Sequence, residues 1–319
     1  MCDKMKSFLP GEVWRDTDSN PIQAHGGGVL FCDGVYYWYG EHKGGKTTYE
    51  PTTGLSRIDV VGVSCYSSKN LYDWKYEGLA LPANKTDPEH DLYTKKVVER
   101  PKVIYNETTK KYVMWMHVDN EDYSFACAGI AVSDAPTGPF AYVGSIRPNS
   151  AESWDMTLFK DSDREAYLIR ASCHNSANSF ERRSEWDDTL RISELTEDYL
   201  NVRDESITLC VNRYREAPAV FTRGGKYYLI TSGCTGWNPN EAEYAVADHM
   251  MGPWKSMGNP CIGEGSEKTF CSQSTFVLPV GGMEGAYIFL ADRWNESDLS
   301  DSRYVWLPIR FDGDSISIS

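Results

Sequence analysis

Five polar side chains recur at one register along this chain of 319 residues. Each stands four residues before an apolar residue within a strand-like run: His25, Glu99, Asp155, Glu216 and Gln273. Successive members of the set are 74, 56, 61 and 57 residues apart. Three of the five are carboxylic acids, the residue type that glycosidic bond hydrolysis uses to protonate a leaving oxygen and to manage the attacking water.

The elements that must position these residues are repeated pairs of short strands. After each polar residue comes a second strand signal (GVYYWYG, KKYVMWMH, REAYLIRAS, GKYYLITSG and GAYIFLADR), whose first Tyr lies 11 to 14 residues downstream. Repeats of about this length built from short strands are typical of β-propellers. We therefore expect an all-β fold, a five-bladed β-propeller, in which residues 1–319 form a single domain.

In a propeller, the first strand of each blade lines the central channel and opens at the same face. The five polar residues are therefore expected to form a ring around the channel mouth. Converging acids repel one another and lose water, which raises the pKa of at least one of them. That favours a general acid beside a group that stays ionised. The alternative is that the ring only caps a solvent-filled channel.

Composition narrows the class of partner. With 46 acidic against 32 basic residues, the net charge of −14 disfavours nucleic acid and an anionic membrane, whereas a neutral polysaccharide or oligosaccharide is compatible with it. The sequence does not indicate an oligomeric state.

The cysteines and the first residues bear on the cellular compartment. The nine Cys lack a CxxC pair, which argues against a disulfide framework and a structural zinc site and favours a reducing compartment. The first residues lack the apolar run of a signal peptide, so we expect a cytoplasmic protein, or an exported one if a signal has been removed.

The phrases SSKNLYDW, SDAPTGPF and ADHMMGPW near the ends of blades, together with acids at blade starts, resemble glycoside hydrolase family 43. The likeness covers essentially the whole chain. The motifs AHGGG, ERPKVIYN, WDMTLFKD, EAPAVF with TSGCTGW, and SQSTF are similar to the branch that includes exo-β-1,3-galactanases. The resemblance implies a five-bladed propeller and hydrolysis with inversion of the anomeric centre.

The resemblance also implies catalytic roles. Glu216 corresponds to the general acid and Asp155 to the carboxylate that tunes its pKa. The usual base in the first blade is absent, since the family's ADP phrase reads AHG here. Gln273 matches an amide that holds the attacking water, either as a base through its imidic tautomer or by orienting the water alone. Glu99 matches an acid that contacts substrate hydroxyls. Inversion leads us to expect Gln273 and Glu216 on opposite sides of the sugar, roughly 6.5–9.5 Å apart.

Other residues are expected to bind the sugar. These substrate-binding candidates are Glu41, Tyr123, Thr235 and Trp237, the last placed at the rim for stacking, with a packed loop anchor as its alternative. His25 is expected to donate a hydrogen bond in the channel, the alternatives being an ion ligand or an orienter of the amide. No HExxH-like spacing supports a metal centre, and no cofactor is expected, although some relatives hold a structural calcium ion in the channel.

The leading hypothesis is an exo-acting, inverting glycosidase that removes terminal β-galactosyl residues from arabinogalactan-type chains. An α-L-arabinofuranosidase, or a β-xylosidase or galactofuranosidase, of the same fold is the first alternative. The missing Asp base motivates a second, a carbohydrate-binding propeller without catalysis. Residues 43–59 are expected to form a long loop, and residues around 8–14 to supply an edge strand to the last blade.

Overall fold

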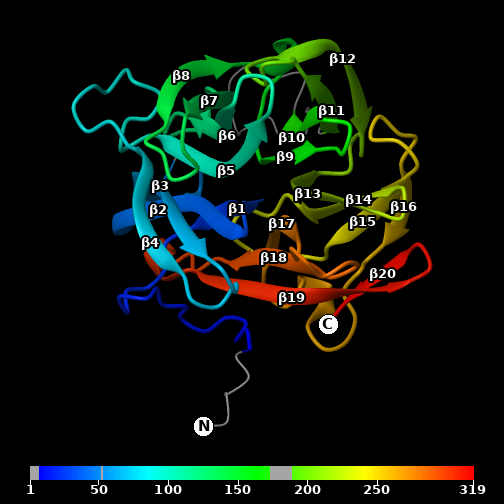
Figure 1. The fold of residues 1–319 in the computed structure, drawn as a ribbon. Coiled ribbons are helices and arrows are strands. Elements are labelled where there is room, and N and C mark those ends of the chain that lie inside the picture. Colours follow the sequence, from blue (N-terminus) through cyan, green and yellow to red (C-terminus); the bar gives the residue numbers. More distant parts are fainter. Residues whose placement is uncertain (1–6, 52, 173–188) are drawn as a thin grey trace.

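Five antiparallel sheets of four strands each surround a central axis (Figure 1). The computed structural model describes residues 7–51, 53–172 and 189–319. In every sheet the strands lie side by side in sequence order, so each blade is a meander of hairpins. This confirms the predicted all-β fold and the five-bladed β-propeller.

The blades follow the chain in order. Blade 1 contains β1 (His25–Cys32), β2 (Val35–Glu50), β3 (Leu55–Ser68) and β4 (Lys75–Pro82). Blade 2 contains β5 (Val97–Asn106), β6 (Lys111–Asp119), β7 (Cys127–Ser133) and β8 (Ala141–Ile146). Blade 3 contains β9 (Met156–Lys160), β10 (Ala166–Ser172), β11 (Thr189–Leu195) and β12 (Val202–Leu209). Blade 4 contains β13 (Arg215–Arg223), β14 (Lys226–Gly233), β15 (Glu243–Ala247) and β16 (Lys255–Gly258). Blade 5 contains β17 (Gln273–Pro279), β18 (Tyr287–Arg293), β19 (Arg303–Asp312) and β20 (Ser315–Ile318).

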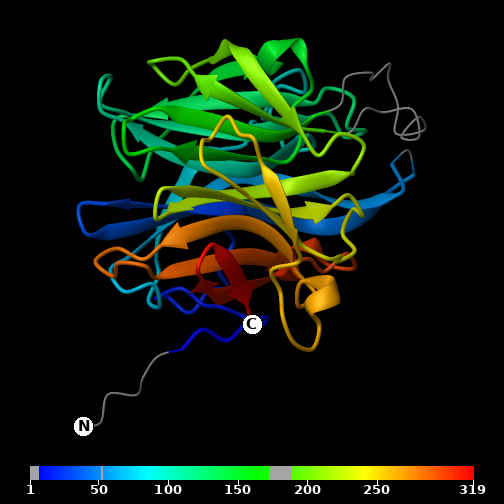
Figure 2. The same cartoon turned by 90° about the vertical axis from the view of Figure 1, so that its right-hand side faces the viewer.

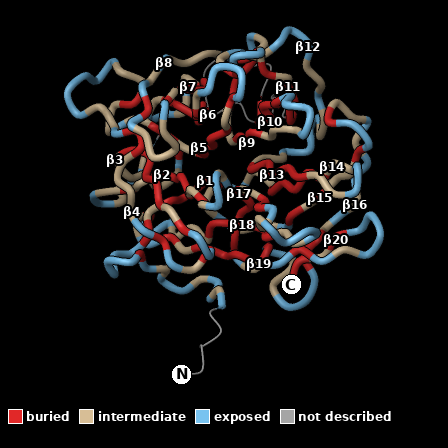
Figure 3. The backbone as a smooth tube through the Cα atoms, viewed as in Figure 1, coloured by how far each residue is buried: buried red, intermediate tan, exposed pale blue. Residues whose placement is uncertain are grey.

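Among the residues that the structure describes, three short 3₁₀ turns lie between strands: η1 (Pro148–Ser150), η3 (Ser266–Lys268) and η4 (Leu299–Asp301). The first strands of the blades meet at the centre, where β1 contacts β5 and β17, and β9 contacts β5 and β13. Figure 3 shows these inner strands as largely buried, whereas the outermost strands are more exposed. No helix in the described part of the chain is long and apolar enough to cross a membrane.

Three inner strands share a kink directly after their polar residue. Register shifts, the mark of a β-bulge, span His25–Gly28, Glu99–Lys102 and Glu216–Ala219. The residue that follows the polar one is left-handed in each: Gly26 (φ 58°), Arg100 (φ 54°) and Ala217 (φ 51°). Successive side chains of a regular strand point to opposite faces, and a bulge re-aims them. Two consecutive side chains can therefore reach the same mouth of the channel.

The predicted long loop at 43–59 is instead an extension of the β2–β3 hairpin. The strand ladder continues through the pairs Lys43–Val60, Thr48–Arg57 and Glu50–Leu55. At 16 and 14 residues, β2 and β3 exceed the 9 and 7 residues of β6 and β7, their equivalents in the next blade. The segment is predicted as a loop because it is rich in Gly, Thr and Lys, but Thr and Tyr, which β2 contains at 47–49, are good strand formers.

The predicted edge strand near residues 8–14 is wrong. All four strands of blade 5 come from the C-terminal part of the chain. Phe8 and Trp14 instead pack against Trp306, with ring centroids 5.5 and 4.9 Å away. The last strand is held from its other side, where Ile318 forms a parallel bridge with Cys261 (Figure 2, the red C-terminal strand beside the yellow-orange loop). Aromatic packing outweighs strand pairing for this segment because Phe8 and Trp14 are too large to leave exposed.

Candidate active site

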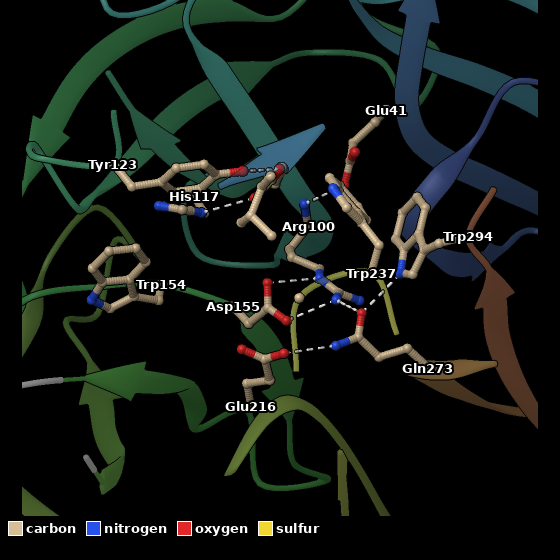
Figure 4. Close-up of a pocket in the computed structure, with 13 residues that line it drawn as sticks. Glu41, Arg100, His117, Tyr123, Trp154, Asp155, Glu216, Trp237, Gln273 and Trp294 are labelled. Atoms are coloured by element: carbon tan, nitrogen blue, oxygen red, sulfur yellow. Dashed lines mark hydrogen bonds and ion pairs between the residues drawn. The ribbon is translucent and has the colours of Figure 1, made fainter. Parts of the chain in front are cut away.

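A pocket opens where the inner strands begin (Figure 4). The space between its walls, counted together with its open mouth, is about 630 Å³. All five blades, or the loops that follow their strands, contribute to it: Glu41, Leu55, Glu99, Arg100, His117, Tyr123, Trp154, Asp155, Glu216, Gly236, Trp237, Gln273 and Trp294. The common starting register of the inner strands is therefore what gathers residues so distant in sequence.

Seven of the nine site residues singled out from the sequence lie in this pocket. They are Glu41, Glu99, Tyr123, Asp155, Glu216, Trp237 and Gln273. Trp237 fits both of its predicted descriptions, because its ring lines the pocket while its Nε1 donates to the Ser56 carbonyl at 2.8 Å.

His25 does not line the pocket, contrary to the predicted ring of five. Its side chain is fully buried and stacks on the Tyr304 ring at 5.1 Å. The Nε2 atom lies 3.2 Å from the Gln23 side-chain oxygen, and the Nδ1 atom lies 3.4 Å from Asp292. The buried Asp292 carboxylate and the Tyr304 ring hold the imidazole against blade 5, away from the mouth.

Thr235 also lies outside the lining. Its hydroxyl donates to the Asn238 carbonyl at 2.5 Å and accepts from the Asn240 amide at 2.7 Å. Short local hydrogen bonds of this kind stabilise a loop. Thr235 therefore shapes the turn that presents Trp237 rather than facing the pocket itself.

Arg100 is the central residue that the sequence analysis missed. Its Nε and Nη2 atoms pair with both oxygens of Asp155, at 2.9 and 2.7 Å. Nη2 also donates to the Gln273 side-chain oxygen at 2.5 Å, and Nη1 donates to the Ser274 carbonyl at 3.1 Å. In a regular strand Arg100 would point away from Glu99, so only the bulge brings both into the pocket. The sequence shows that Arg100 directly follows Glu99, but it does not show the bulge that turns Arg100 into the pocket.

Positively charged side chains lie between the acids of the pocket. The acids therefore do not simply repel one another, as was expected from the sequence. Burial raises the pKa of Glu99, but the hydrogen bond and charge of His117, helped by Lys43 and Tyr123, outweigh it and lower that pKa to about 2. Burial lowers the pKa of His117, yet Asp119 and Glu99 together raise it to about 10. Glu99 is therefore ionised and His117 protonated at neutral pH.

Glu41 and Lys43 form a second compensated pair on the wall. Lys43 Nζ lies 2.7 Å from Glu41 Oε2, and the backbone N–H of Arg100 donates to Glu41 Oε1 at 3.0 Å. Burial raises the pKa of Glu41, with Lys43 acting in the opposite direction. Lys43 also lies over the rings of Trp237 and Trp294, 5.5 and 5.2 Å from their centroids. Such cation–π contacts hold both indoles at the pocket wall.

The amide of Gln273 is oriented by donors on one side and acceptors on the other. Its oxygen accepts from Arg100 Nη2 at 2.5 Å and from Trp294 Nε1 at 2.9 Å. Its nitrogen donates to Glu216 Oε1 at 2.9 Å and to the Ser232 hydroxyl at 3.0 Å. Arginine and indole can only donate, so this amide orientation is unambiguous. Gln273 thus touches Glu216, whereas the sequence analysis placed the two on opposite sides of a sugar.

Aromatic rings supply the remaining surface. Tyr123 and Trp154 are nearly parallel, with centroids 5.9 Å apart and an interplanar angle of 10°. The Tyr123 hydroxyl donates to Glu99 Oε1 at 3.0 Å. Trp154 and Trp294 were not predicted, because neither stands at the repeated register. The flat faces of such rings are suited to stacking on sugars.

No group of three or more His, Cys, Asp or Glu side chains within the described residues is arranged to hold a metal ion.

Deeper in the channel lies Lys102, whose Nζ donates to the Gly26 carbonyl at 2.7 Å. Burial and the neighbouring Arg100 charge lower the pKa of Lys102 to about 7. The seven Cys residues of the described segments are all free thiols.

Comparisons place this geometry among known proteins. Residues 32–274 match the family model of glycosyl hydrolases family 43, and a search of curated proteins found no match. A β-1,3-galactosidase of that family, solved with galactodeoxynojirimycin, is 38% identical, with 98% of both chains covered and a TM-score of 0.84.

Two exo-β-1,3-galactanases are also similar. The enzyme from Clostridium thermocellum is 38% identical with a TM-score of 0.80. The enzyme from Phanerochaete chrysosporium, solved as a Glu→Gln variant with β-1,3-galactotriose, is 33% identical with a TM-score of 0.82. Each likeness covers 98% of the present chain but only 64% and 66% of the other. The present chain thus spans a little under two thirds of the length of those two proteins.

Proposed function

Because the chain belongs to glycosyl hydrolases family 43, it is a glycoside hydrolase, and we propose that it removes terminal β-D-galactosyl residues from β-1,3-linked galactan of the arabinogalactan type. The proposed enzyme is exo-acting and inverts the anomeric centre. The observation that carries the proposal is the 38% identity to a β-1,3-galactosidase over 98% of both chains. An α-L-arabinofuranosidase and a propeller without catalysis are not favoured by these neighbours.

Glu216 is the general acid of the proposed reaction. It lies at the start of β13, half-buried, and its Oε1 accepts the Gln273 amide N–H. The proton passes from the Glu216 carboxyl group to the glycosidic oxygen as the bond from that oxygen to the anomeric carbon breaks, so the departing sugar leaves as a neutral alcohol.

Asp155 is proposed to act next to the acid as an ionised carboxylate. Arg100 grips both of its oxygens, and such bidentate pairs are strong and geometrically specific. The same guanidinium reaches Gln273, so one side chain links Asp155 to the amide that touches Glu216. Arg100 therefore sets the distance between the acid and its neighbouring charge.

An inverting enzyme needs a second group on the opposite face of the sugar to receive a proton from the attacking water. We assign this role to Glu99, which is ionised and held by Tyr123 and His117. In Figure 4 those two partners lie on the other side of the pocket from Gln273. The neutral amide oxygen of Gln273 is a weaker base than a carboxylate, so the proposed role of Gln273 is to orient Glu216.

The pocket wall supplies sugar recognition. Glu41 lines the wall beside Lys43, and Trp237 and Trp294 offer flat apolar faces. A buried site built to hydrogen-bond a hydroxyl strongly rejects an analogue that lacks it, because its polar groups would then be unpaired. This supports a site that distinguishes one sugar from another.

The experiment that tests this function is a substrate panel. The purified protein is incubated with aryl β-galactoside, aryl α-L-arabinofuranoside, aryl β-xyloside, β-1,3-galactan and arabinogalactan. We expect galactose from the β-galactoside and from β-1,3-galactan. Release of arabinose or xylose with no galactose would assign the chain to another activity of the same family.

A further inference from the structure

The extended β2–β3 hairpin is the feature that the catalytic roles leave unused. Beyond Lys43 and Val60 the two strands stay paired through Thr48–Arg57, Tyr49–Ser56 and Glu50–Leu55. Neither strand carries one of the repeated polar residues in this extension. A hairpin that stays ordered so far from its own sheet needs contacts elsewhere, because an isolated two-stranded hairpin is marginally stable in water.

Those contacts reach three other blades. Thr47 Oγ1 accepts the backbone N–H of Leu299, in blade 5, at 2.9 Å. The Ser56 carbonyl accepts Trp237 Nε1, from the β14–β15 loop of blade 4, at 2.8 Å. Arg57 pairs with Glu121, between β6 and β7 of blade 2, at 3.0 Å. In a ring of five, blades 2 and 5 adjoin blade 1 but blade 4 does not, so the hairpin tip and the β14–β15 loop meet beyond the first strands of their own blades.

The hairpin meets Trp237 at the pocket itself. Leu55, Gly236 and Trp237 all line the cavity. Gly236 is left-handed (φ 60°), and a Cβ there would lie 2.8 Å from Leu55 Cδ2, so the loop and the hairpin are in close contact. Trp237 is braced further by the Trp294 ring, 5.1 Å away. These contacts make a continuous wall.

The wall stands on the side of the pocket away from the acid. In Figure 4, Trp237 and Glu41 lie to one side of Arg100, and Glu216 and Trp154 lie to the other. A second, smaller cavity shares Glu41 and Trp237 and is lined by Arg57 of the hairpin. The hairpin therefore divides what would otherwise be a longer groove.

We propose that the hairpin tip at Leu55–Arg57, docked on Trp237, closes the pocket beyond the terminal sugar and so restricts cleavage to chain ends. This inference rests on the proposed function, since it assumes a polymeric glycoside. A sugar whose linkage oxygen meets Glu216 has its far edge against this wall. Another sugar on that edge would clash with Leu55 and Trp237, so one residue is released at each cleavage.

The test follows β-1,3-galactotetraose labelled at its reducing end. With the wild-type protein the label should appear first in the trisaccharide. In the Leu55→Gly/Trp237→Gly double variant, the label should also appear early in the mono- or disaccharide, with internal cleavage rising at least about tenfold relative to terminal cleavage. Tenfold is a difference of about 1.4 kcal/mol between the two binding modes. Tyr49→Ala is the matched control, because Tyr49 lies on the same hairpin with its side chain 65% exposed, and it should keep the wild-type order of products.

A second variant removes the hairpin tip altogether. Lys43 and Val60 face each other in the ladder, so residues 44–59 can be replaced by a two-residue Asn-Gly turn.

The wild-type protein supplies an independent measurement that needs no variant. A tetraose with a methyl group on O3 of its terminal galactosyl unit should be cleaved at least about tenfold more slowly than the free tetraose, a difference of about 1.4 kcal/mol.

Two results would overturn the inference. One is a folded, active variant of either design that still releases only terminal sugars. The other is equal cleavage of the capped and free tetraose by the wild type. If the wild-type protein degrades another polymer instead of galactan, the proposed substrate fails, and the same product order is read on that polymer.

Discussion

Glu216 Oε1 accepts the Gln273 amide N–H, and this contact orients the carboxyl group that acts as the acid. The amide is in turn held by Arg100 and Trp294, and Arg100 by Asp155. At the scale of the residue, the site is therefore one connected hydrogen-bond network. Networks of this kind are sensitive to the loss of any member.

Glu216→Gln removes the acid proton while preserving the shape of the side chain. We expect turnover on β-1,3-galactobiose to fall by roughly 10²–10⁴-fold, the usual contribution of general acid catalysis. An aryl galactoside with a good leaving group needs little protonation, so its hydrolysis should fall much less. Steady-state rates on the two substrates make the comparison. An equal loss on both would remove Glu216 from the acid role.

Gln273→Glu tests whether this residue orients the acid. One oxygen of the new carboxylate keeps Arg100 and Trp294 as partners, while the other faces Glu216 Oε1. Two carboxyl groups this close share a proton, which raises the pKa of Glu216. The acid then stays protonated to higher pH, so the basic limb of the pH–rate profile should move upward as maximal turnover falls. Full turnover with an unmoved limb would show that Gln273 does not act through Glu216.

Much of this site could be predicted from the types and spacing of residues. The register of Glu99, Asp155, Glu216 and Gln273 was sufficient, because equivalent positions of a propeller converge. Arg100 and the exclusion of His25 could not be predicted. Both depend on a local bulge and on buried partners that carry no signature in a single sequence.

At the scale of the element, close backbone contacts hold the first two strands of blade 1 in register. The ladder pairs His25 with Glu41, and Gly40 lies beside this pair on β2. A Cβ on Gly40 would lie 2.0 Å from the carbonyl carbon of Ala24. No side chain can be accommodated there without separating β1 from β2.

Gly40→Ala is therefore expected to destabilise the protein. Overpacking of this kind usually costs about 1–3 kcal/mol, and here the obstacle is backbone, which cannot rotate away. Thermal unfolding should show a lower Tm. Gly233→Ala is the matched control, because its added Cβ would approach only the Asn240 side chain, at 3.3 Å. Equal Tm values for the two variants would contradict the close approach of β1 and β2.

The sequence predicted the strand pairs of the blades correctly. It failed for residues 8–14 and 43–59, because the structure of these segments depends on contacts with residues far away in the sequence. The paired strand signals identified all five blades. The sequence predicts a third blade over about 151–203, with an irregular segment at 173–188. The blade extends to Leu209, because the exposed strand β12 has little hydrophobic pattern. Residues 173–188 lie outside the described residues.

At the scale of the whole molecule, Lys102 ties blade 1 to blade 2 inside the channel. Its Nζ donates to the carbonyl of Gly26, the left-handed residue that follows His25. The side chain is only 2% exposed. A buried ammonium without a carboxylate partner is costly, and its pKa is lowered to about 7 as a result.

Lys102 should therefore make stability depend on pH. Below about pH 7 the folded and unfolded chains both carry the proton, and the cost of burying the charge is fully felt. Between about 7 and the ordinary value of 10.5 the unfolded chain binds a proton that the folded chain does not, so the free energy of unfolding rises with pH. Urea unfolding of the wild type and Lys102→Met across this range isolates the effect, because other groups titrate in both. We expect the free energy of unfolding of the wild type to rise relative to that of Lys102→Met as pH increases. A difference between the two proteins that stays constant with pH would contradict the low pKa of Lys102.

The central claim is that this propeller hydrolyses terminal β-1,3-galactosyl linkages with inversion. The most direct measurement is proton NMR of β-1,3-galactobiose during its first minutes with the enzyme, before the released sugar mutarotates. An acid and a water-activating group on opposite faces of the ring predict that the galactose from the non-reducing end appears first as the α anomer. Initial release of the β anomer would contradict the assignment of Glu216 and Glu99, and an intact disaccharide would contradict the proposed substrate.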